Sequence, residues 1–350
     1  EVNFSDPINI QTIVDACNAS DVVIINSLPS KGHNQESIDA FAKILDAIQS
    51  PIVFVQHDHS MHSIKRNRCM DEAVQKSSVI FSHSRTNDFA DEVQKITGSG
   101  GLSTLFGEDE DDGKDVLNFQ PGLDFDVIRE KYWKPIEEQD DIHNKWIGRT
   151  TSWKGYQEMF KFHDNYLRPG NFLTTMEGVE KGFAFIPFKS FKYGEWEGDA
   201  YRINEIEKWD LKPGNRMYLF GPYHNEDMLE RMSKVAFGYQ LALLKPRFIE
   251  RSIEYGHCEV VCSGTMPVFR EAYGKSCIHR KTGDPLIESK NNGTIWLPDD
   301  VNSMQRAYEQ IQFFSANPKA RDEMREKAYE FYRSHQDAQY TFDEMMRQIK

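Results

Sequence analysis

The sequence predicts an α/β protein made of two domains, each built on a parallel sheet. Short apolar runs of strand type alternate along the chain with segments whose apolar residues recur at helical spacing. Strands that are separated by helices pair in parallel, because the chain must cross over the sheet between them. The length of 350 residues corresponds to about two domains of ~100–200 residues each.

The first half of the chain shows this alternation clearly. Strands are expected at residues 21–26, 51–55 and 78–81, and helices at residues 35–48 and 72–76. An acidic stretch at residues 137–141 then precedes the next strand. The first domain is therefore predicted to span residues 1–140.

The second half repeats the pattern with more aromatic residues, and its domain is predicted over residues 141–332. One strand ends at Gly148, and a helix is expected to begin near Trp153. Further strands are expected at residues 172–176, 217–220 and 266–269, and helices at residues 227–235, 247–258, 320–333 and 342–349. The last helix, within residues 333–350, is expected to pack back on the first domain.

The composition excludes some classes of protein. The net charge is −13, from 55 acidic and 42 basic side chains, which argues against non-specific coating of nucleic acid but permits a local basic groove. The five cysteines are an odd number and widely spread, which favours a reducing, cytosolic setting over a disulfide framework. No apolar run of about 18 residues predicts a membrane span.

The segment from Lys145 to Gly155 is the strongest functional signal. A strand ends at Gly148-Arg149, and Lys154-Gly155 follows just before an amphipathic helix. The glycines free the backbone, and two cations beside a helix N-terminus attract phosphate oxygens. This pattern predicts that Gly148, Arg149 and Lys154 bind a diphosphate.

A second polar segment, Gln56-His57-Asp58-His59-Ser60, follows the strand at residues 51–55. Open α/β sheets bind their ligands at the C-terminal ends of the strands. Asp58 is a candidate general base or stabiliser of a cationic transition state, and His57 is a candidate contact for a sugar hydroxyl or a phosphate. The alternatives are a helix cap formed by Asp58 or Ser60 and a metal site, for which the sequence offers no third ligand cluster.

Lys65, Arg66 and Arg68 place three cations within four residues of an otherwise acidic chain. Next to His57 and Asp58, they are predicted to contact nucleic-acid phosphates. An ordinary solvated helix face remains the alternative.

Two further segments resemble ligand contacts. Residues 231–240, with Phe237, Gly238 and Tyr239, are a second candidate phosphate or sugar loop, in which Gly238 would allow close approach to the backbone. The alternative is a glycine at a junction of strand and helix. Glu259, five residues before Gly264, offers the paired acceptors that a ribose requires, or is a solvated helical residue. His257, Cys258 and Cys262 could bind a metal or could simply pack in the core, and we favour packing.

These segments together resemble a glycosyltransferase of the GT-B type, which commonly has a Gly-Arg and Lys-Gly pair on the diphosphate and a Glu before a Gly-Thr-Pro-Val-like strand. More closely, they resemble the DNA α-glucosyltransferases of T-even bacteriophages from about Phe4 to the C-terminus. The matching motifs are Ile25-Asn26-Ser27, Gln56-His57-Asp58-His59-Ser60, Phe81-Ser82-His83-Ser84, Trp146-Ile147-Gly148-Arg149-Thr150-Thr151, Met228-Leu229-Glu230-Arg231-Met232-Ser233-Lys234 and Phe237-Gly238-Tyr239-Gln240-Leu241.

The resemblance implies transfer of glucose from UDP-glucose to the hydroxymethyl group of 5-hydroxymethylcytosine in double-stranded phage DNA, with retention at the anomeric carbon. The acceptor base would be flipped out of the duplex. The resemblance implies UDP-glucose as the donor and no tightly bound metal. The protein is expected to act as a monomer in the cytoplasm of the infected host. Alternatives are another UDP-sugar, such as a UDP-pentose like arabinose, a non-DNA acceptor, or an inactive module that binds sugar nucleotide or DNA.

The resemblance also assigns roles to single residues. Arg149 and Lys154 would hold the diphosphate, Glu259 the uridine ribose, and Glu254 another part of the donor. His57 and Asp58 would lie beside the transferred sugar, and Ser84 and Arg85 are expected to join the DNA contacts. Two departures stand out: the family's N-terminal strand and Gly-rich loop are missing from the first domain, and Val235-Ala236 replace the first Glu of the wider acidic pair.

Overall fold

The computed structural model divides into two compact units. Unit 1 comprises Glu1–Gln120, Pro246–Ser252 and Thr341–Lys350, and unit 2 comprises Pro121–Lys245 and Ile253–Tyr340. The structure describes residues 7–349 except 27, 30–33, 57–66, 83–91, 94, 98–115, 119–121, 151–153, 180–190, 194–195, 198–199, 202–209, 222, 243–252, 278, 280–283 and 290–291.

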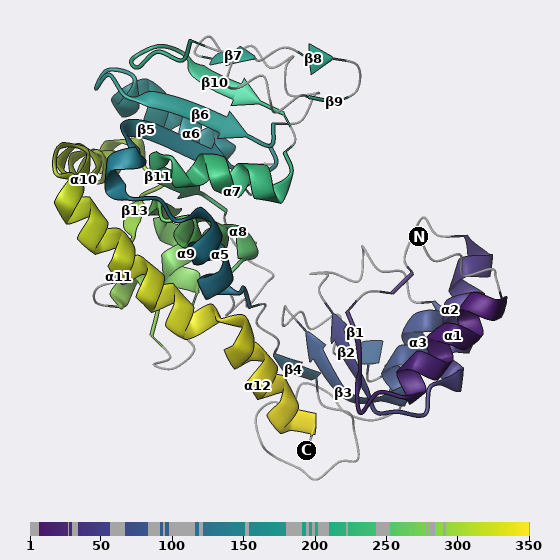
Figure 1. Cartoon of the computed structure of the whole chain (residues 1–350). Coiled ribbons are helices and arrows are strands. Elements are labelled where there is room, and N and C mark those ends of the chain that lie inside the picture. Colours follow the sequence, from purple (N-terminus) through teal and green to yellow (C-terminus); the bar gives the residue numbers. More distant parts are fainter. Residues whose placement is uncertain are drawn as a thin grey trace. The chain divides into compact units, whose positions relative to one another are not determined.

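Unit 1 contains a parallel sheet in the strand order β1-β2-β3-β4 (Figure 1). The strands are β1 (Val23–Ile25), β2 (Ile52–Gln56), β3 (Ser77–Ser82) and β4 (Val116–Asn118). The helices are α1 (Pro7–Asn18), α2 (Gln35–Ala47) and α3 (Arg68–Lys76). Asn34 and Asn67 cap α2 and α3: each side chain accepts a hydrogen bond from the backbone N–H of the third residue of its helix.

Both faces of the unit 1 sheet are covered, as is usual for parallel strands. Ile52 and Phe54 of β2 pack with the helices α2 and α3 on one face. The alternate residues Val53 and Val55 pack on the other face with Met345 of α12 (Ala338–Ile349). The continuous apolar sequence of β2 therefore reflects burial on both sides.

Unit 2 is built on a larger parallel sheet in the order β13-β12-β11-β5-β6-β10-β7. Its strands are β5 (Asp140–Ile147), β6 (Leu173–Glu177), β7 (Phe191–Tyr193), β10 (Met217–Phe220), β11 (Val235–Gln240), β12 (Met266–Arg270) and β13 (Ile295–Leu297). β8 (Trp196–Glu197) and β9 (Ala200–Tyr201) form a separate antiparallel pair. The predicted α/β class with two parallel sheets is thus confirmed.

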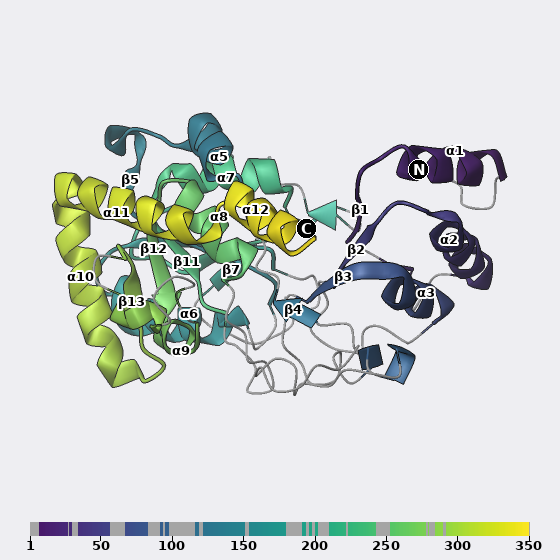
Figure 2. The same ribbon diagram turned by 90° about the horizontal axis from the view of Figure 1, so that it is seen from below.

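Helices cover both faces of the unit 2 sheet (Figures 1 and 2). One face packs with α6 (Tyr156–Phe162), a π-helical turn (His163–Leu167) and α10 (Gln305–Ala316). The other face packs with α5 (Phe125–Tyr132), α7 (Asn225–Ser233), α8 (Tyr255–Cys262), α9 (Glu271–Ser276) and α11 (Pro318–Gln336). Short 3₁₀ turns lie at Ile136–Glu138, Leu286–Glu288 and Val301–Met304.

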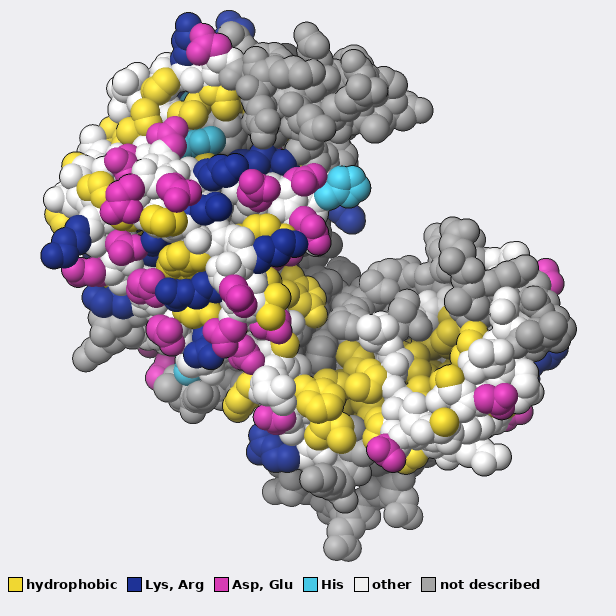
Figure 3. All heavy atoms as spheres, in the orientation of Figure 1, with side chains coloured by type: hydrophobic (Ala, Val, Ile, Leu, Met, Phe, Trp, Pro, Cys, Tyr) yellow, Lys and Arg dark blue, Asp and Glu magenta, His cyan; other side chains and the backbone are white. Residues whose placement is uncertain are grey.

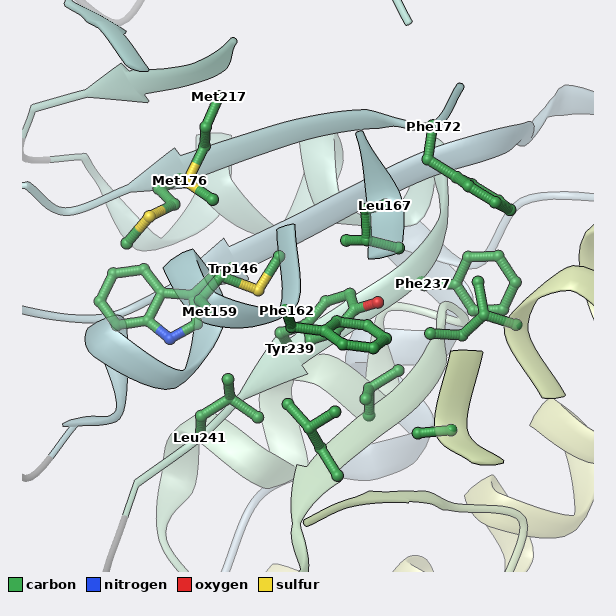
Figure 4. Packing of buried hydrophobic residues seen from close by; sticks show 14 of the residues in the cluster. Trp146, Met159, Phe162, Leu167, Phe172, Met176, Met217, Phe237, Tyr239 and Leu241 are labelled. Atoms are coloured by element: carbon green, nitrogen blue, oxygen red, sulfur yellow. The ribbon is translucent and has the colours of Figure 1, made fainter. Parts of the chain in front are cut away.

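The sheet separates two apolar cores, because successive strand residues point to opposite faces. Trp146 of β5 lies in the core with Phe162, Phe237 and Tyr239 (Figure 4). Its neighbour Ile147 lies in the opposite core, among residues of α5, α7, α8 and α11. This burial on both faces fixes the position of the ends of β5.

Two boundaries differ from the sequence-based expectation. Unit 2 begins at Pro121 rather than after residue 140, because Phe125 and Tyr132 of α5 are buried in its core. At the other end, the division falls within α12, between Tyr340 and Thr341, rather than at residue 333.

Candidate functional site

The strand order of unit 2 defines a switch point between β5 and β11. From β5, the chain adds β6 and β10 on one side and then returns to add β11, β12 and β13 on the other. Connections therefore leave the C-terminal ends of β5 and β11 in opposite directions. Ligands of open parallel sheets bind in the crevice that such a switch creates.

The segment after β5 returns to this point at Gly155. Gly155 has a φ of +74°, and a Cβ atom there would lie 2.1 Å from the carbonyl oxygen of Leu241, just after β11. Only glycine permits this conformation and this contact without strain. Gly155 therefore seats the start of α6 against the end of β11 and places Lys154 at the switch point.

Lys154 meets α8 at the same place. Its Nζ donates a hydrogen bond of 2.6 Å to Oε2 of Glu254, and both side chains are largely buried, with 16% and 14% of their area exposed. Glu254 precedes α8 and is held through its backbone N–H, which donates to the hydroxyl of Tyr273 over 2.8 Å. An ammonium group has three donors, so Lys154 can hold Glu254 and a phosphate oxygen together.

Glu259 lies further along α8 and shares this environment. Burial raises the pKa of its carboxyl group, and the charge of Lys154 opposes the shift. Tyr223, after β10, also feels these charges: burial raises the Tyr223 pKa, the charges of Glu259 and Glu177 add to the rise, and Arg149 opposes it.

Arg149 itself is exposed and has no hydrogen bond or ion pair to another described residue. Gly148, before it, donates its N–H to the carbonyl oxygen of Glu177 over 3.1 Å. The structure thus brings Gly148, Arg149, Lys154, Glu254 and Glu259 to one edge of the unit 2 sheet. This group combines two cations with two carboxylates, which suits a nucleotide with a diphosphate and a ribose.

The expectation of a ligand loop at residues 231–240 is wrong. Phe237, Gly238 and Tyr239 lie within β11, between β5 and β12. Phe237 and Tyr239 are fully buried, and the Tyr239 hydroxyl donates to Asn144. A Cβ on Gly238 would lie 2.8 Å from Val260 Cγ1, so this glycine serves helix–sheet packing and none of the three offers a side chain to a ligand.

The proposed acceptor residues lie mainly outside the described part of the chain. This applies to His57, Asp58, Lys65, Arg66, Ser84 and Arg85. The strands before them, β2 and β3, are neighbours in the unit 1 sheet and end at Gln56 and Ser82. Arg68 is described: it opens α3, its side chain is half exposed, and it lies 3.8 Å from Glu72.

The metal alternative at His257 gains no support. His257 stacks on Tyr273 at 3.9 Å between ring centroids, and Cys258 and Cys262 are buried. The described residues contain no group of three side chains that could hold a metal ion together. Packing explains these side chains.

Tyr223 at this edge is not among the residues that the sequence singles out, and Gln240 enters there only as the end of the candidate loop at residues 231–240. Gln240 is the last residue of β11 and is 3% exposed, and its Oε1 lacks a hydrogen-bond partner among the described residues. Its position after a run of apolar strand residues was the available signal. No signal in the sequence identifies Tyr223, because its position depends on the strand order.

On the face of unit 2 shown in Figure 3, Lys and Arg side chains are interspersed with Asp and Glu. Of the helices in the described residues, none combines the length and hydrophobicity that a membrane span requires.

Comparisons with known proteins identify the family of this chain. The family model for DNA alpha-glucosyltransferase matches residues 6–319. The DNA alpha-glucosyltransferase of Enterobacteria phage T4 is 39% identical over 98% of this chain and 85% of its own length. An alpha-glucosyltransferase solved with UDP-glucose and DNA containing an abasic site is 38% identical, with a TM-score of 0.82 over 97% of this chain and 83% of that one.

A second solved alpha-glucosyltransferase, in complex with UDP and a 13-mer DNA containing a HMU base, is 36% identical, with a TM-score of 0.83 over 99% of this chain and 84% of that chain. The match covers both units and the elements that carry Arg149, Lys154 and Glu259. This chain therefore belongs to the DNA alpha-glucosyltransferase family.

Proposed function

We propose that this chain transfers glucose from UDP-glucose to the hydroxymethyl group of 5-hydroxymethylcytosine in double-stranded DNA, with retention at the anomeric carbon. The observation that carries the proposal is the group of Arg149, Lys154, Glu254 and Glu259 at the switch point of the unit 2 sheet, in a member of this family. Relatives with more than a third of their residues identical bind UDP-glucose, UDP and DNA in their solved structures.

The donor end of the reaction follows from the contacts in unit 2. Arg149 and Lys154 bind the diphosphate and stabilise the charge that builds on UDP as it leaves. Glu254 orients the Lys154 ammonium and contacts the donor. Glu259 accepts the two ribose hydroxyls with its ionised carboxylate.

The acceptor end is assigned to unit 1. Asp58 stabilises the oxocarbenium-like centre or orients the acceptor hydroxyl, and His57 contacts the transferred sugar. Lys65, Arg66, Arg68, Ser84 and Arg85 bind the DNA backbone. The acceptor base is flipped out of the duplex, because a base in the stack leaves no room for the donor.

Retention requires the acceptor hydroxyl to attack the face that UDP leaves. Both a short-lived ion pair and a covalent glycosyl intermediate produce this outcome. The chain acts as a monomer in the cytoplasm of the infected bacterium. This location fits the phage relative and the DNA substrate.

The test is mass spectrometry of DNA incubated with the purified chain and one UDP-sugar at a time. With UDP-glucose we expect a hexose on 5-hydroxymethylcytosine, and no addition to matched DNA that contains only cytosine. The anomeric proton coupling by NMR then reports the linkage. The variant Arg149→Ala should react about 100-fold more slowly, as for loss of one charge-stabilising donor.

Each alternative has its own signature in this experiment. Addition of a pentose alone identifies another donor. Binding of UDP and DNA without any transfer identifies an inactive module, and absence of UDP binding refutes the proposal.

A further inference from the structure

A buried ion network lies beneath the Gly148-Arg149 segment. The Lys145 Nζ donates to Glu177 Oε1 over 2.5 Å, and Arg231 donates through Nε and Nη2 to both oxygens of Glu177, each over 3.0 Å. The Glu177 side chain is 1% exposed, Lys145 3% and Arg231 15%. We refer to these three residues as the Glu177 triad.

The triad joins three elements at the switch-point edge. Lys145 belongs to β5, Glu177 is the last residue of β6, and Arg231 lies in the last turn of α7. Burial acts to raise the pKa of Glu177, but the charges of Lys145 and Arg231 outweigh it and leave the pKa below its ordinary value. The carboxylate is therefore ionised and fully paired.

Glu177 also holds the ligand segment through its backbone. Its carbonyl oxygen accepts the N–H of Gly148, the residue before Arg149. The next residue, Gly178, lies close to Tyr223: a Cβ on Gly178 would lie 3.1 Å from the Tyr223 ring. Glu177 thus contacts the end of β5 through its backbone, and its side chain binds Lys145 of β5 and Arg231 of α7.

Stability alone does not require these two buried cations and one buried anion. Replacing a buried ion network by apolar side chains is often neutral or stabilising, and the two cores on either side of the sheet already bind β5 to β6. A fully paired network is, however, a rigid one, and a rigid support keeps a ligand-binding residue in place before the ligand arrives.

We propose that Glu177 is a positioning residue that holds Arg149 for the donor diphosphate through the Glu177 triad. The proposal rests on the proposed function, because it needs UDP at Arg149. A second interpretation makes a different prediction: if the triad acts only as a buried positive charge, then removing the negative charge of Glu177 leaves two cations and strengthens UDP binding.

The experiment measures UDP affinity by calorimetry for the full chain and its variants. Glu177→Gln should weaken UDP binding about tenfold, within the usual range of coupling between sites. It should raise the KM for UDP-glucose more than it lowers kcat. Asp141→Asn is the matched control. Asp141 lies at the opposite end of β5 and pairs with the buried Arg321 over 2.5 Å. This substitution therefore also breaks the ion pair of a buried arginine.

A double-mutant cycle with Arg149→Ala separates positioning from general destabilisation. If Glu177 acts through Arg149, Glu177→Gln changes UDP affinity less than about twofold once Arg149 is gone. If Glu177→Gln does not fold, Arg231→Gln replaces it in the same cycle, since it leaves the Lys145–Glu177 pair intact.

The outcomes are distinct. Weaker binding in Glu177→Gln with a non-additive cycle and an unaffected Asp141→Asn supports the proposal. Unchanged or tighter binding, or additive effects, overturns it while leaving the proposed function in place. A wild-type chain that does not bind UDP instead overturns the proposed function.

Discussion

Substitution of Gly155 by alanine tests whether the backbone of the ligand segment must lie against β11. The added Cβ would lie 2.1 Å from the carbonyl oxygen of Leu241 and 2.6 Å from its Cβ. A residue other than glycine in this left-handed region costs about 1–3 kcal/mol, and forced overpacking costs about 1–3 kcal/mol more. We expect a loss of about 2–6 kcal/mol in the free energy of unfolding of unit 2.

The same substitution should displace Lys154 from the diphosphate. Loss of one charge-assisted hydrogen bond is worth about 1.5–3 kcal/mol, so UDP should bind at least about tenfold more weakly. Urea unfolding measures the first effect, and calorimetry below the unfolding transition measures the second.

Gly293→Ala is the matched control for this experiment. Gly293 has a φ of +67°, and its Cβ would lie 2.4 Å from backbone atoms of Met324 and Ala328. It precedes β13 and therefore lies at the N-terminal edge of the sheet, away from Lys154. Both variants should lose stability, but only Gly155→Ala should lose UDP affinity. Equal UDP affinity in the two folded variants would refute the reasoning.

Three further predictions concern single side chains. Burial raises the Glu259 pKa above its ordinary 4.5, so UDP affinity should fall as the pH drops towards that raised pKa. The variant Glu259→Gln should bind UDP weakly, and its affinity should not depend on pH in this way. Calorimetry across a range of pH measures both affinities. Asp58→Ala should lower kcat about 10²–10⁴-fold with unchanged UDP affinity, and unchanged turnover would remove Asp58 from the mechanism. Tyr239→Phe should cost about 1 kcal/mol of stability, through the lost bond to Asn144, while UDP titration matches wild type.

Only the ionised form of Glu259 suits the ribose. The ribose hydroxyls need the ionised carboxylate, and a raised pKa means that the proton returns at a higher pH than for an ordinary glutamate. The same raised pKa makes protonation favour the folded chain. Its contribution to stability is present at low pH and is lost as the pH rises through the folded pKa. Affinity for UDP and this part of the stability should therefore change in opposite directions.

Much of the fold could be predicted because strand and helix signals are local. The apolar runs at residues 51–55 and 217–220 correspond to β2 and β10, since burial on both faces leaves a continuous apolar sequence. Gly238 misled the prediction for the opposite reason. A glycine within an apolar run indicates a loop as readily as a close approach of helix to strand, and only the positions of Val260 and Thr265 decide between them.

The candidate site could be predicted only in part. The residues of the Lys145–Gly155 segment are contiguous, so their chemistry can be recognised from the sequence. The pairing of Lys154 with Glu254 spans 100 residues, and that of Lys145 with Glu177 spans 32. Such pairs depend on strand order, which hydrophobic periodicity does not encode.

The assignment of Thr341–Lys350 to unit 1 has a consequence for synthesis on the ribosome. Domains generally fold in the order in which they emerge. Here Met345, which packs on Val53, Val55 and Phe81, is translated only after all of unit 2. One face of the unit 1 sheet therefore stays uncovered during elongation, and the unit that begins first is completed last.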